Sequence, residues 1–248
     1  MAQLSLWEKT SGTWINVATV ILGTALGQLL RGSLPRSIQL VITQGLGLFT
    51  VFLGLTMAQS LLAVKMGPIS GVILGLIAIT LGSILGELLQ LEVKLHQLGD
   101  WLKDNVQGGS KFTEGFVAAS LLFCIGPMAI LGCLNNGLSG KQDILVIKAV
   151  MDGIASVALT SSYGIGVGFS ALMILLYQGS LSMAAGFFAQ VLPDPSNDPT
   201  VLLMSGVGGL MVLGIGLQLL EITQVRLASF LPALFVAPLL VILIKVWS

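Results

Sequence analysis

The stretch SLLFCIGPMAILGCLNNGLSGK, residues 120–141, has the apolar length of a membrane helix but is interrupted in its middle. Gly126 and Pro127 stand together at the interruption, and Asn135 and Asn136 follow in the second half. Proline removes a backbone donor and crowds the preceding turn of a helix. Inside a bilayer, broken backbone is tolerated only where protein or a watery cavity surrounds it. We therefore expect a discontinuous membrane helix beside a polar site. The alternative is an ordinary proline kink with a capped C-terminus.

The composition assigns the chain to a broad class. Of its 248 residues, 55% are hydrophobic and only 9% are charged, whereas a soluble domain carries about 25% charged residues. A helix needs roughly 20 apolar residues to cross a bilayer, and several runs have this length. The sequence therefore predicts an all-α, polytopic transmembrane helical bundle, in which residues 1–248 form one integral membrane domain in contact with the lipid bilayer.

About eight membrane spans can be placed along the chain. Residues 92–113 carry too many charges to cross, and their leucines recur at helical spacing, which predicts an amphipathic helix on the membrane surface. The remaining sequence divides into a first repeat half (14–91), central helices (114–165) and a second repeat half (166–248). The predicted spans are residues 14–31, 38–60, 68–91, 115–134, 145–161, 166–190, 201–220 and 229–247.

An internal repeat relates the first three spans to the last three. Sliding the chain by 161 residues places Gly47 on Gly208, and one residue more places Asn16 on Gln178. Five crossings separate the corresponding spans, so the two halves would have opposite orientation, as in the inverted repeats of many transporters. Coincidence is the alternative, because apolar residues match one another easily in such a chain. Gln178 also lies before Gly179, where we expect a second helix interruption.

Two carboxylates are the main candidates for function. Asp152 lies inside the fifth span, and Glu114 opens the fourth. An ionisable group at membrane depth costs several kcal/mol unless it is paired or hydrated, which makes it a functional candidate. Lys148 stands one turn before Asp152, so a structural ion pair within the helix is the alternative. Glu114 could equally lie at the membrane interface.

Polar residues near the breaks complete the candidate site. Asn16 and Gln178 are expected to face each other at the interface of the two repeat halves, and Ser120 shares a helical face with Pro127. Freed carbonyls and half-helix ends at the breaks can face a solute or ion. The candidate residues for binding a solute or ion are Asn16, Glu114, Ser120, Gly126, Pro127, Asn135, Asn136, Asp152 and Gln178.

Several classes of function are disfavoured. His96 is the only histidine, so no metal cluster, cofactor-type ligand set or nucleophilic triad can be assembled around it, and we expect no cofactor and no enzymatic activity. Eleven basic and eleven acidic residues cancel, and no basic tract offers a nucleic-acid surface. Cys124 and Cys133 are too far apart on one helix for a disulfide and are expected to be reduced. Glycines at small-xxx-small spacing would allow helix packing, including packing of a homo-oligomer.

The order of these motifs resembles a known family. The matching pieces run over the whole chain and are TWINVATVILGTALGQLL, ITQGLGLFTVFLGLTMA, LGSILGELL, EGFVAASLLFCIGPMAILGCLNNGLSG, MDGIASV, YQGSLSMAA, GVGGLMVLGIGLQLL and LPALFVAP. Together they resemble the bacterial membrane proteins grouped as domain of unknown function 554, the YqgA/YdfK type. The resemblance implies a multi-pass protein of the bacterial inner membrane and suggests transport, without a substrate.

Two hypotheses of function follow. In the first, the chain is a secondary transporter or channel for a small solute or ion, with Asp152 and Glu114 beside broken helices at a polar site within the membrane. In the second, it is a scaffold or regulatory subunit that acts through helix association, and Asp152 is merely paired to Lys148. The chemical class of the solute is not indicated by the sequence.

Overall fold

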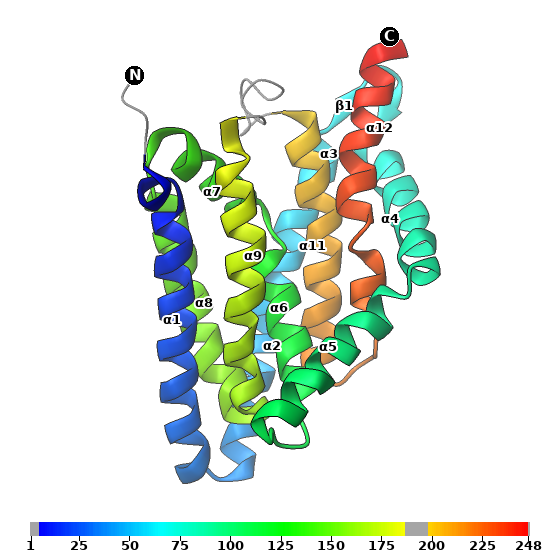
Figure 1. Ribbon diagram of the computed structural model, residues 1–248. Helices are drawn as coiled ribbons and strands as arrows, with labels where there is room; N and C mark the ends of the chain where they lie inside the picture. The colour runs from blue at the N-terminus through cyan, green and yellow to red at the C-terminus, as the bar shows by residue number, and fades with distance from the viewer. Residues whose placement is uncertain (1–4, 187–197, 248) are drawn as a thin grey trace. The chain divides into compact units, whose positions relative to one another are not determined.

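The computed structural model of the chain describes residues 5–186 and 198–247, and nearly all of them are helical (Figure 1). The predicted all-α fold is confirmed. A single antiparallel hairpin among the described residues pairs β1 with β2, Lys65 opposite Ser70. The α-helices are α1 (Leu6–Ser33), α2 (Arg36–Ala58), α3 (Ser60–Ala63), α4 (Gly71–Leu88), α5 (Leu91–Val106), α6 (Phe112–Cys124), α7 (Pro127–Ser139), α8 (Asp143–Tyr163), α9 (Ser170–Met183), α11 (Pro199–Leu219) and α12 (Ala233–Trp247); the 3-10 helices are η1 (Ile165–Phe169) and η2 (Leu227–Phe230), and the strands are β1 (Lys65–Met66) and β2 (Ile69–Ser70).

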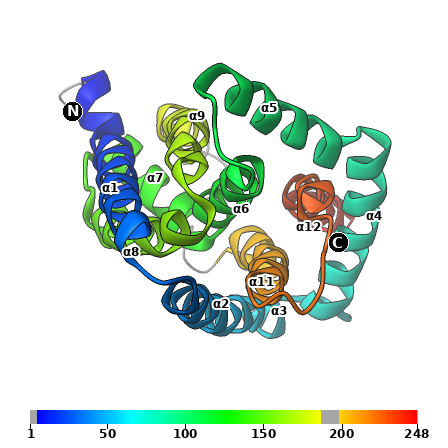
Figure 2. The same cartoon turned by 90° about the horizontal axis from the view of Figure 1, so that it is seen from below.

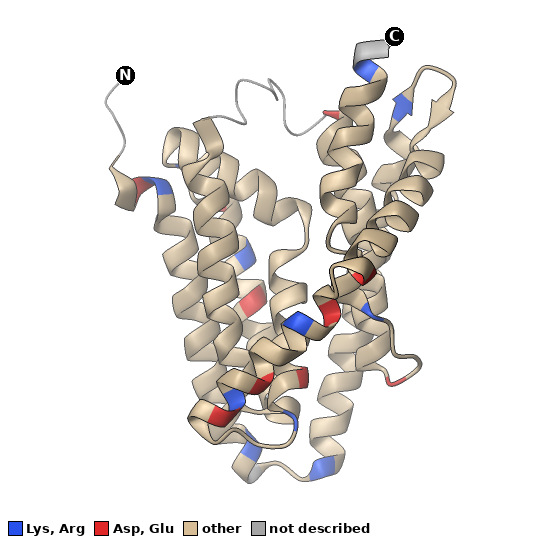
Figure 3. Ribbon diagram, turned by 45° about the vertical axis from the view of Figure 1, so that its right-hand side comes forward, with Lys and Arg blue, Asp and Glu red and all other residues tan. Residues whose placement is uncertain are grey.

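Seven helical segments in the described part of the chain are long and apolar enough to cross a membrane. The bent pair of α6 and α7 brings the number to eight if the pair crosses once. The expected number of spans therefore agrees with the structure, and charged residues are sparse along the helices (Figure 3). The predicted end of the sixth span, at residue 190, lies outside the described residues.

The break predicted at Gly126 and Pro127 is present. Helix α6 ends at Cys124, α7 begins at Pro127, and the two are bent by 61°. Gly126 has a φ of +147°, which side-chain-bearing residues rarely adopt. The alternative considered from the sequence, a proline kink within one continuing helix, does not apply. Pro127 occupies the first position of α7, where the N–H of a residue has no partner within the helix, so the missing N–H removes no hydrogen bond.

The prediction of a second helix interruption at Gln178 and Gly179 is wrong. Helix α9 runs without a break from Ser170 to Met183, through Gln178 and Gly179. A glycine inside a helix costs about 1 kcal/mol relative to alanine but does not by itself end the helix. The surrounding apolar residues are therefore sufficient to carry α9 across this position.

The amphipathic helix predicted over 92–113 corresponds to α5, but it is shorter. It ends at Val106, because Gln107 takes a left-handed φ of +50° and the amide of Gly108 then bonds back to the carbonyl of Lys103. A turn follows before α6 begins at Phe112. The rest of the predicted segment therefore belongs to this turn and to the start of α6.

The chain forms two compact units. The first contains α1, the beginning of α2 up to Gln44, the end of α5, the whole of α6, α7 from Met128, then α8, η1 and α9. The second contains the rest of α2, α3, α4, the start of α5, α11, η2 and α12, and includes the break at 125–127. Within the first unit α1 packs along α8 and α9, and within the second α12 packs against α4 and α11 (Figure 2).

Glycines allow the close helix contacts of both units. In the first unit, Gly23 of α1 lies against the carbonyl of Gly153 in α8, and Gly27 lies one turn further along against Val157. A side chain at Gly23 or Gly27 would clash with the backbone of α8. The small-xxx-small pattern of α1 therefore serves helix packing, as expected for helices that associate within a membrane.

In the second unit, α2 and α11 meet through two sets of close contacts. Gly54 lies against the backbone of Leu213 and the carbonyl of Gly209. At the other end of the contact, Gly216 lies against the backbone of Val51, and also against the carbonyl of Gly47. As the residue number rises along α2 it falls along α11, so the two helices are antiparallel.

Candidate functional site

Lys148 and Asp152 form a buried ion pair in the middle of α8. Lys148 Nζ contacts Asp152 Oδ2 one helical turn away, and the two side chains are only 7% and 10% exposed. The pairing weighed from the sequence is therefore present. Burial removes both charges from water at a cost in free energy. The Coulombic attraction between them offsets this cost only if further hydrogen bonds satisfy the remaining polar atoms of the site.

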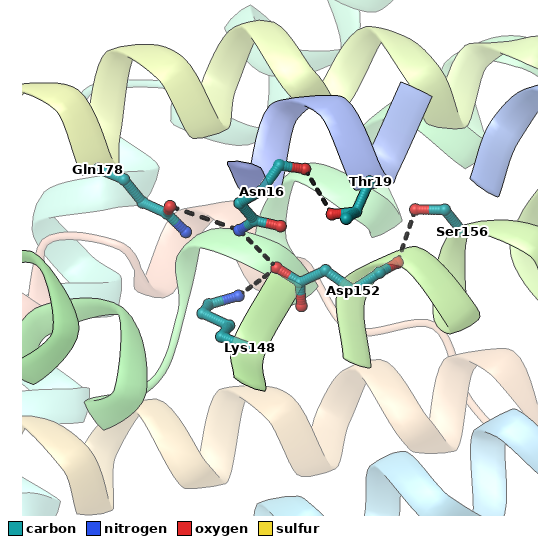
Figure 4. Close-up of polar contacts among 6 residues, drawn as sticks. All are labelled: Asn16, Thr19, Lys148, Asp152, Ser156 and Gln178. Carbon is teal, nitrogen blue, oxygen red and sulfur yellow. Dashed lines mark hydrogen bonds and ion pairs between the residues drawn. The ribbon is translucent and has the colours of Figure 1, made fainter. Parts of the chain in front are cut away.

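Helices α1 and α9 supply these further bonds. Asn16 of α1 donates from Nδ2 to Asp152 Oδ2 at 2.9 Å and, at 3.4 Å, to the amide oxygen of Gln178 on α9. Both amide side chains are fully buried. Figure 4 shows the two amides and the ion pair meeting between the three helices. We call Asn16, Lys148, Asp152 and Gln178 the polar cluster.

Hydroxyl groups next to the polar cluster bond to their own helices. Thr19 Oγ1 donates to the carbonyl of Asn16 at 2.9 Å, and Ser156 Oγ donates to the carbonyl of Asp152 at 2.7 Å (Figure 4). Such bonds satisfy a buried hydroxyl without a ligand. These two residues therefore support the helices that carry the cluster, and they leave its side-chain atoms free for other partners.

The polar cluster has hydrogen-bonding capacity that the described residues do not use. Within these residues, Asn16 Oδ1 and Gln178 Nε2 are buried and have no hydrogen-bond partner, and the same holds for the hydroxyl of Thr13, one turn before Asn16 on α1. Oδ1 of Asp152 accepts none of the bonds made to Oδ2. Buried polar atoms in proteins are almost always paired, so unpaired ones indicate water or a ligand. The cluster therefore offers both acceptors and a donor.

Thr13 was not among the residues singled out from the sequence. It lies one turn before Asn16 on the same face of α1 and is fully buried. The signal was its spacing from Asn16, but threonine is so common in membrane helices that spacing alone could not distinguish it. Ser120, which was singled out, is buried in α6.

Glu114 does not join the polar cluster. It is exposed in the first turn of α6. A carboxylate there interacts favourably with the unpaired N–H groups at the helix N-terminus. Of the two candidate carboxylates, only Asp152 therefore belongs to the buried site.

The two adjacent asparagines have different surroundings. Asn135 is exposed on α7, whereas Asn136 is fully buried. Asn136 accepts a bond from the amide of Gly12 at 3.0 Å and donates to the carbonyl of Glu8 at 3.0 Å. Both ends of its amide are thus used by the backbone of α1. Asn136 anchors α7 to the first turns of the helix that carries Asn16.

The remaining candidates, Gly126 and Pro127, contribute the backbone break described above and no side-chain polar group. The thiols of Cys124 and Cys133 are free, as the sequence predicts. In residues 5–186 and 198–247, no group of three or more His, Cys, Asp or Glu side chains is placed to hold a metal ion. The polar cluster is therefore the main concentration of buried side-chain chemistry that we identify in the first unit.

Comparison with known proteins shows which family this sequence matches. The family of proteins of unknown function DUF554 matches residues 11–242. The uncharacterized membrane protein YdfK of Bacillus subtilis is 30% identical over 237 residues, covering 96% of this chain and 98% of YdfK. The uncharacterized protein YqgA of Escherichia coli is 30% identical over 233 residues, covering 91% and 94% of the two chains. No solved structure matches the chain significantly.

Proposed function

The chain belongs to the DUF554 family of multi-pass membrane proteins, and we propose that it is a secondary transporter or channel for a small solute or ion in the bacterial inner membrane. The observation that carries the proposal is the polar cluster. It places a carboxylate, an ammonium group and two amides in the middle of helices of membrane length, with polar atoms left over for a ligand.

The energetics of burial favour a functional origin of the cluster. Replacing a buried ion pair by well-packed apolar residues is often neutral or stabilising by about 1–4 kcal/mol. A helix bundle that only needs to pack would therefore gain little from Lys148 and Asp152, and still less from Asn16 and Gln178. Ionisable residues inside membrane helices typically mark solute or proton pathways.

The contacts of α2 and α11 support the inverted repeat that the proposed mechanism uses. Asn16 and Gln178 are 162 positions apart, and the same shift carries Gly47, Val51 and Gly54 onto Gly209, Leu213 and Gly216. The shift maps Gly54 onto Gly216, and its reverse maps Leu213 onto Val51. The contact of Gly54 with Leu213 therefore corresponds to the contact of Gly216 with Val51, and both contacts are present.

Reciprocal contacts of this kind are what a two-fold axis produces. Because α2 and α11 are antiparallel, the axis would relate halves of opposite orientation. The same shift of 162 residues relates Asn16 to Gln178, which are paired in the first unit. Rocking of two inverted halves around a buried site is a common basis of alternating access.

A second candidate function rests on the ion pair itself. Lys148 neutralises Asp152, and the glycines of α1 pack it tightly on α8. In a scaffold or regulatory subunit, the pair would hold the helices in register and nothing would pass. The unpaired atoms of Asn16 and Gln178 favour the transporter, because a purely structural network would be expected to satisfy them.

Flux in proteoliposomes tests the proposal. We expect a screen of labelled ions and small metabolites to reveal a solute whose uptake is lost in Asp152→Asn. Asp143→Asn is the matched control, because it neutralises an exposed carboxylate at the start of the same helix. If no solute moves and Asp152→Asn changes only the thermal stability of the protein, the scaffold is the correct function.

A further inference from the structure

The charges around the polar cluster restrict what it can bind. Lys148 and Asp152 cancel, and α1 presents the amide of Asn16, with its charged residues Glu8, Lys9 and Arg31 in its first and last turns. The titratable groups near the pair on the other packed elements are the thiol of Cys124 on α6 and that of Cys133 on α7, with Tyr177 of α9 close to both thiols. Thiols and phenols are ordinarily neutral at pH 7. The cluster as a whole therefore has no net charge.

The unused atoms of the cluster are mostly oxygens. Oδ1 of Asn16 and, one turn earlier on α1, the hydroxyl of Thr13 have no partner, and Oδ1 of Asp152 receives neither of the bonds made to Oδ2. Carboxylate, amide carbonyl and hydroxyl oxygens are the ligands of hard cations. An anion would find two neutral donors, the amide nitrogen of Gln178 and the hydroxyl of Thr13, and an ammonium group that a carboxylate already occupies. The donor set therefore favours a cation.

A cation that joins this site would leave it with a buried positive charge, which is strongly unfavourable in a low-dielectric environment. Release of one proton from Lys148 removes that charge. On the same reasoning, a divalent ion would leave one uncompensated charge even after Lys148 had lost its proton. Because both side chains are buried, the site suits a bare ion better than an organic solute.

We propose that the polar cluster exchanges one monovalent alkali cation for one proton, with Lys148 as the competitor of the cation for Asp152. This inference rests on the proposed transport function and names its substrate class. As the cation binds, an N–H bond of the Lys148 ammonium breaks, its proton passes to water, and the cation replaces the ammonium at Asp152. When the cation leaves on the other side, the amine takes a proton from water. The site is neutral at both stages, so the exchange moves no net charge.

The decisive variant is Lys148→Arg. Arginine keeps the ion pair with Asp152 but does not release its proton in proteins. We expect purified wild-type protein in liposomes that contain a pH-sensitive dye to make the lumen alkaline when Na⁺, K⁺ or Li⁺ is added outside. We expect Lys148→Arg and Asp152→Asn to lower this exchange at least about tenfold. Asp143→Asn should exchange like the wild type.

Cation binding in detergent gives a second measurement that does not depend on flux. If one proton and one cation compete, the apparent dissociation constant for Na⁺ should rise roughly tenfold for each unit fall in pH. The thermal stabilisation that NaCl produces beyond that of an equal concentration of choline chloride measures this binding. In Lys148→Arg we expect no such stabilisation, and therefore no dependence of binding on pH.

The outcomes separate the inference from the proposed function. Transport of a neutral or zwitterionic solute that needs Asp152 but moves no protons would overturn the inference and leave the function standing. Exchange at the wild-type rate in Lys148→Arg would overturn the role of the lysine proton. Absence of all flux, with Na⁺ failing to stabilise the wild type more than Asp152→Asn, would overturn both.

Discussion

At the scale of single residues, the two carboxylate oxygens of Asp152 differ in how they are bonded. Oδ2 of Asp152 receives both Lys148 and Asn16, whereas Oδ1 receives neither. A carboxylate with one free oxygen can bind a ligand while Asn16 keeps its bond to Oδ2. In the proposed exchange, the ion pair with Lys148 is therefore the state of the site before a cation binds.

A double-mutant cycle measures how far Lys148 and Asp152 depend on each other. Removing one partner, as in Lys148→Met or Asp152→Leu, should lower the free energy of unfolding by about 3–5 kcal/mol, because it leaves an unpaired buried charge. The double variant should recover most of this loss yet remain without flux. Thermal unfolding in detergent gives the stabilities. Additive losses in the double variant would mean that the two charges do not interact.

The sequence predicted parts of this site for identifiable reasons. The i,i+4 spacing of Lys148 and Asp152 allows an ion pair on any helix, so the pair could be anticipated. Asn16 and Gln178 came from the internal repeat, since nothing local relates residues so far apart. Whether Asn136 faces a solute or anchors α1 depends on how α7 is placed after the break, which no local pattern encodes.

At the scale of elements, the break between α6 and α7 depends on Gly126 more than on Pro127. Gly126→Ala should lower the free energy of unfolding by about 1–3 kcal/mol, because alanine is strained at a φ of +147°. Pro127→Ala should change it by less than about 1 kcal/mol, since the first position of a helix loses no internal bond. Unfolding of both variants in the same detergent makes the comparison. A larger loss in Pro127→Ala would show that proline, and not glycine, maintains the break.

The start of α11 allows a prediction about pH. Asp198 is the N-cap: Oδ1 accepts a bond from the amide of Thr200 at 2.7 Å, and Oδ2 lies 3.3 Å from Lys245 Nζ. Partial burial acts to raise the pKa of Asp198, but the bonds from Thr200 and the charge of Lys245 outweigh it and hold the pKa below its ordinary value. The ionised carboxylate therefore stabilises the fold above the unfolded-state pKa, and this contribution is lost as pH falls through the folded-state pKa.

Asp198→Asn tests this directly, because asparagine keeps the capping acceptor and removes the charge. We expect it to unfold at a lower temperature than the wild type at pH 7, with a difference that shrinks as the pH is lowered through the acidic range. Asp198→Ala should lose the cap as well, at a cost of about 1 kcal/mol, and should differ from the wild type at every pH. A constant difference between wild type and Asp198→Asn would contradict the assignment.

Helix positions followed from apolar run length, because a membrane helix must be long and almost free of charge. Breaks were harder to predict. Gly126 followed by proline did end a helix, whereas Gly179 did not, since a lone glycine only weakens a helix that its neighbours still favour. The β1–β2 hairpin was not predicted, because its two-residue strands are too short for alternation to be recognised.

At the scale of the whole chain, the inverted repeat makes a claim about crossings. Lys65, after α2, and Gln224, after α11, lie in the segments that follow these two related helices, and both are exposed. The candidate membrane spans between them are α4, the bent pair of α6 and α7, α8, α9 and α11. If the bent pair crosses the membrane once, the two residues face opposite sides. If it entered and returned as a re-entrant loop, they would face the same side, which conflicts with the antiparallel contact of α2 and α11.

Thiol labelling decides between these topologies. In a background with Cys124→Ala and Cys133→Ala, we expect Lys65→Cys and Gln224→Cys to react with a membrane-impermeant maleimide from opposite sides, in intact cells for one and only in inverted vesicles for the other. The permeant form of the reagent should label both variants in either preparation, which controls for folding and access. Labelling of both positions from one side would mean an even number of crossings between them. That result would contradict the antiparallel contact of α2 and α11, and alternating access by two inverted halves would have no structural basis here.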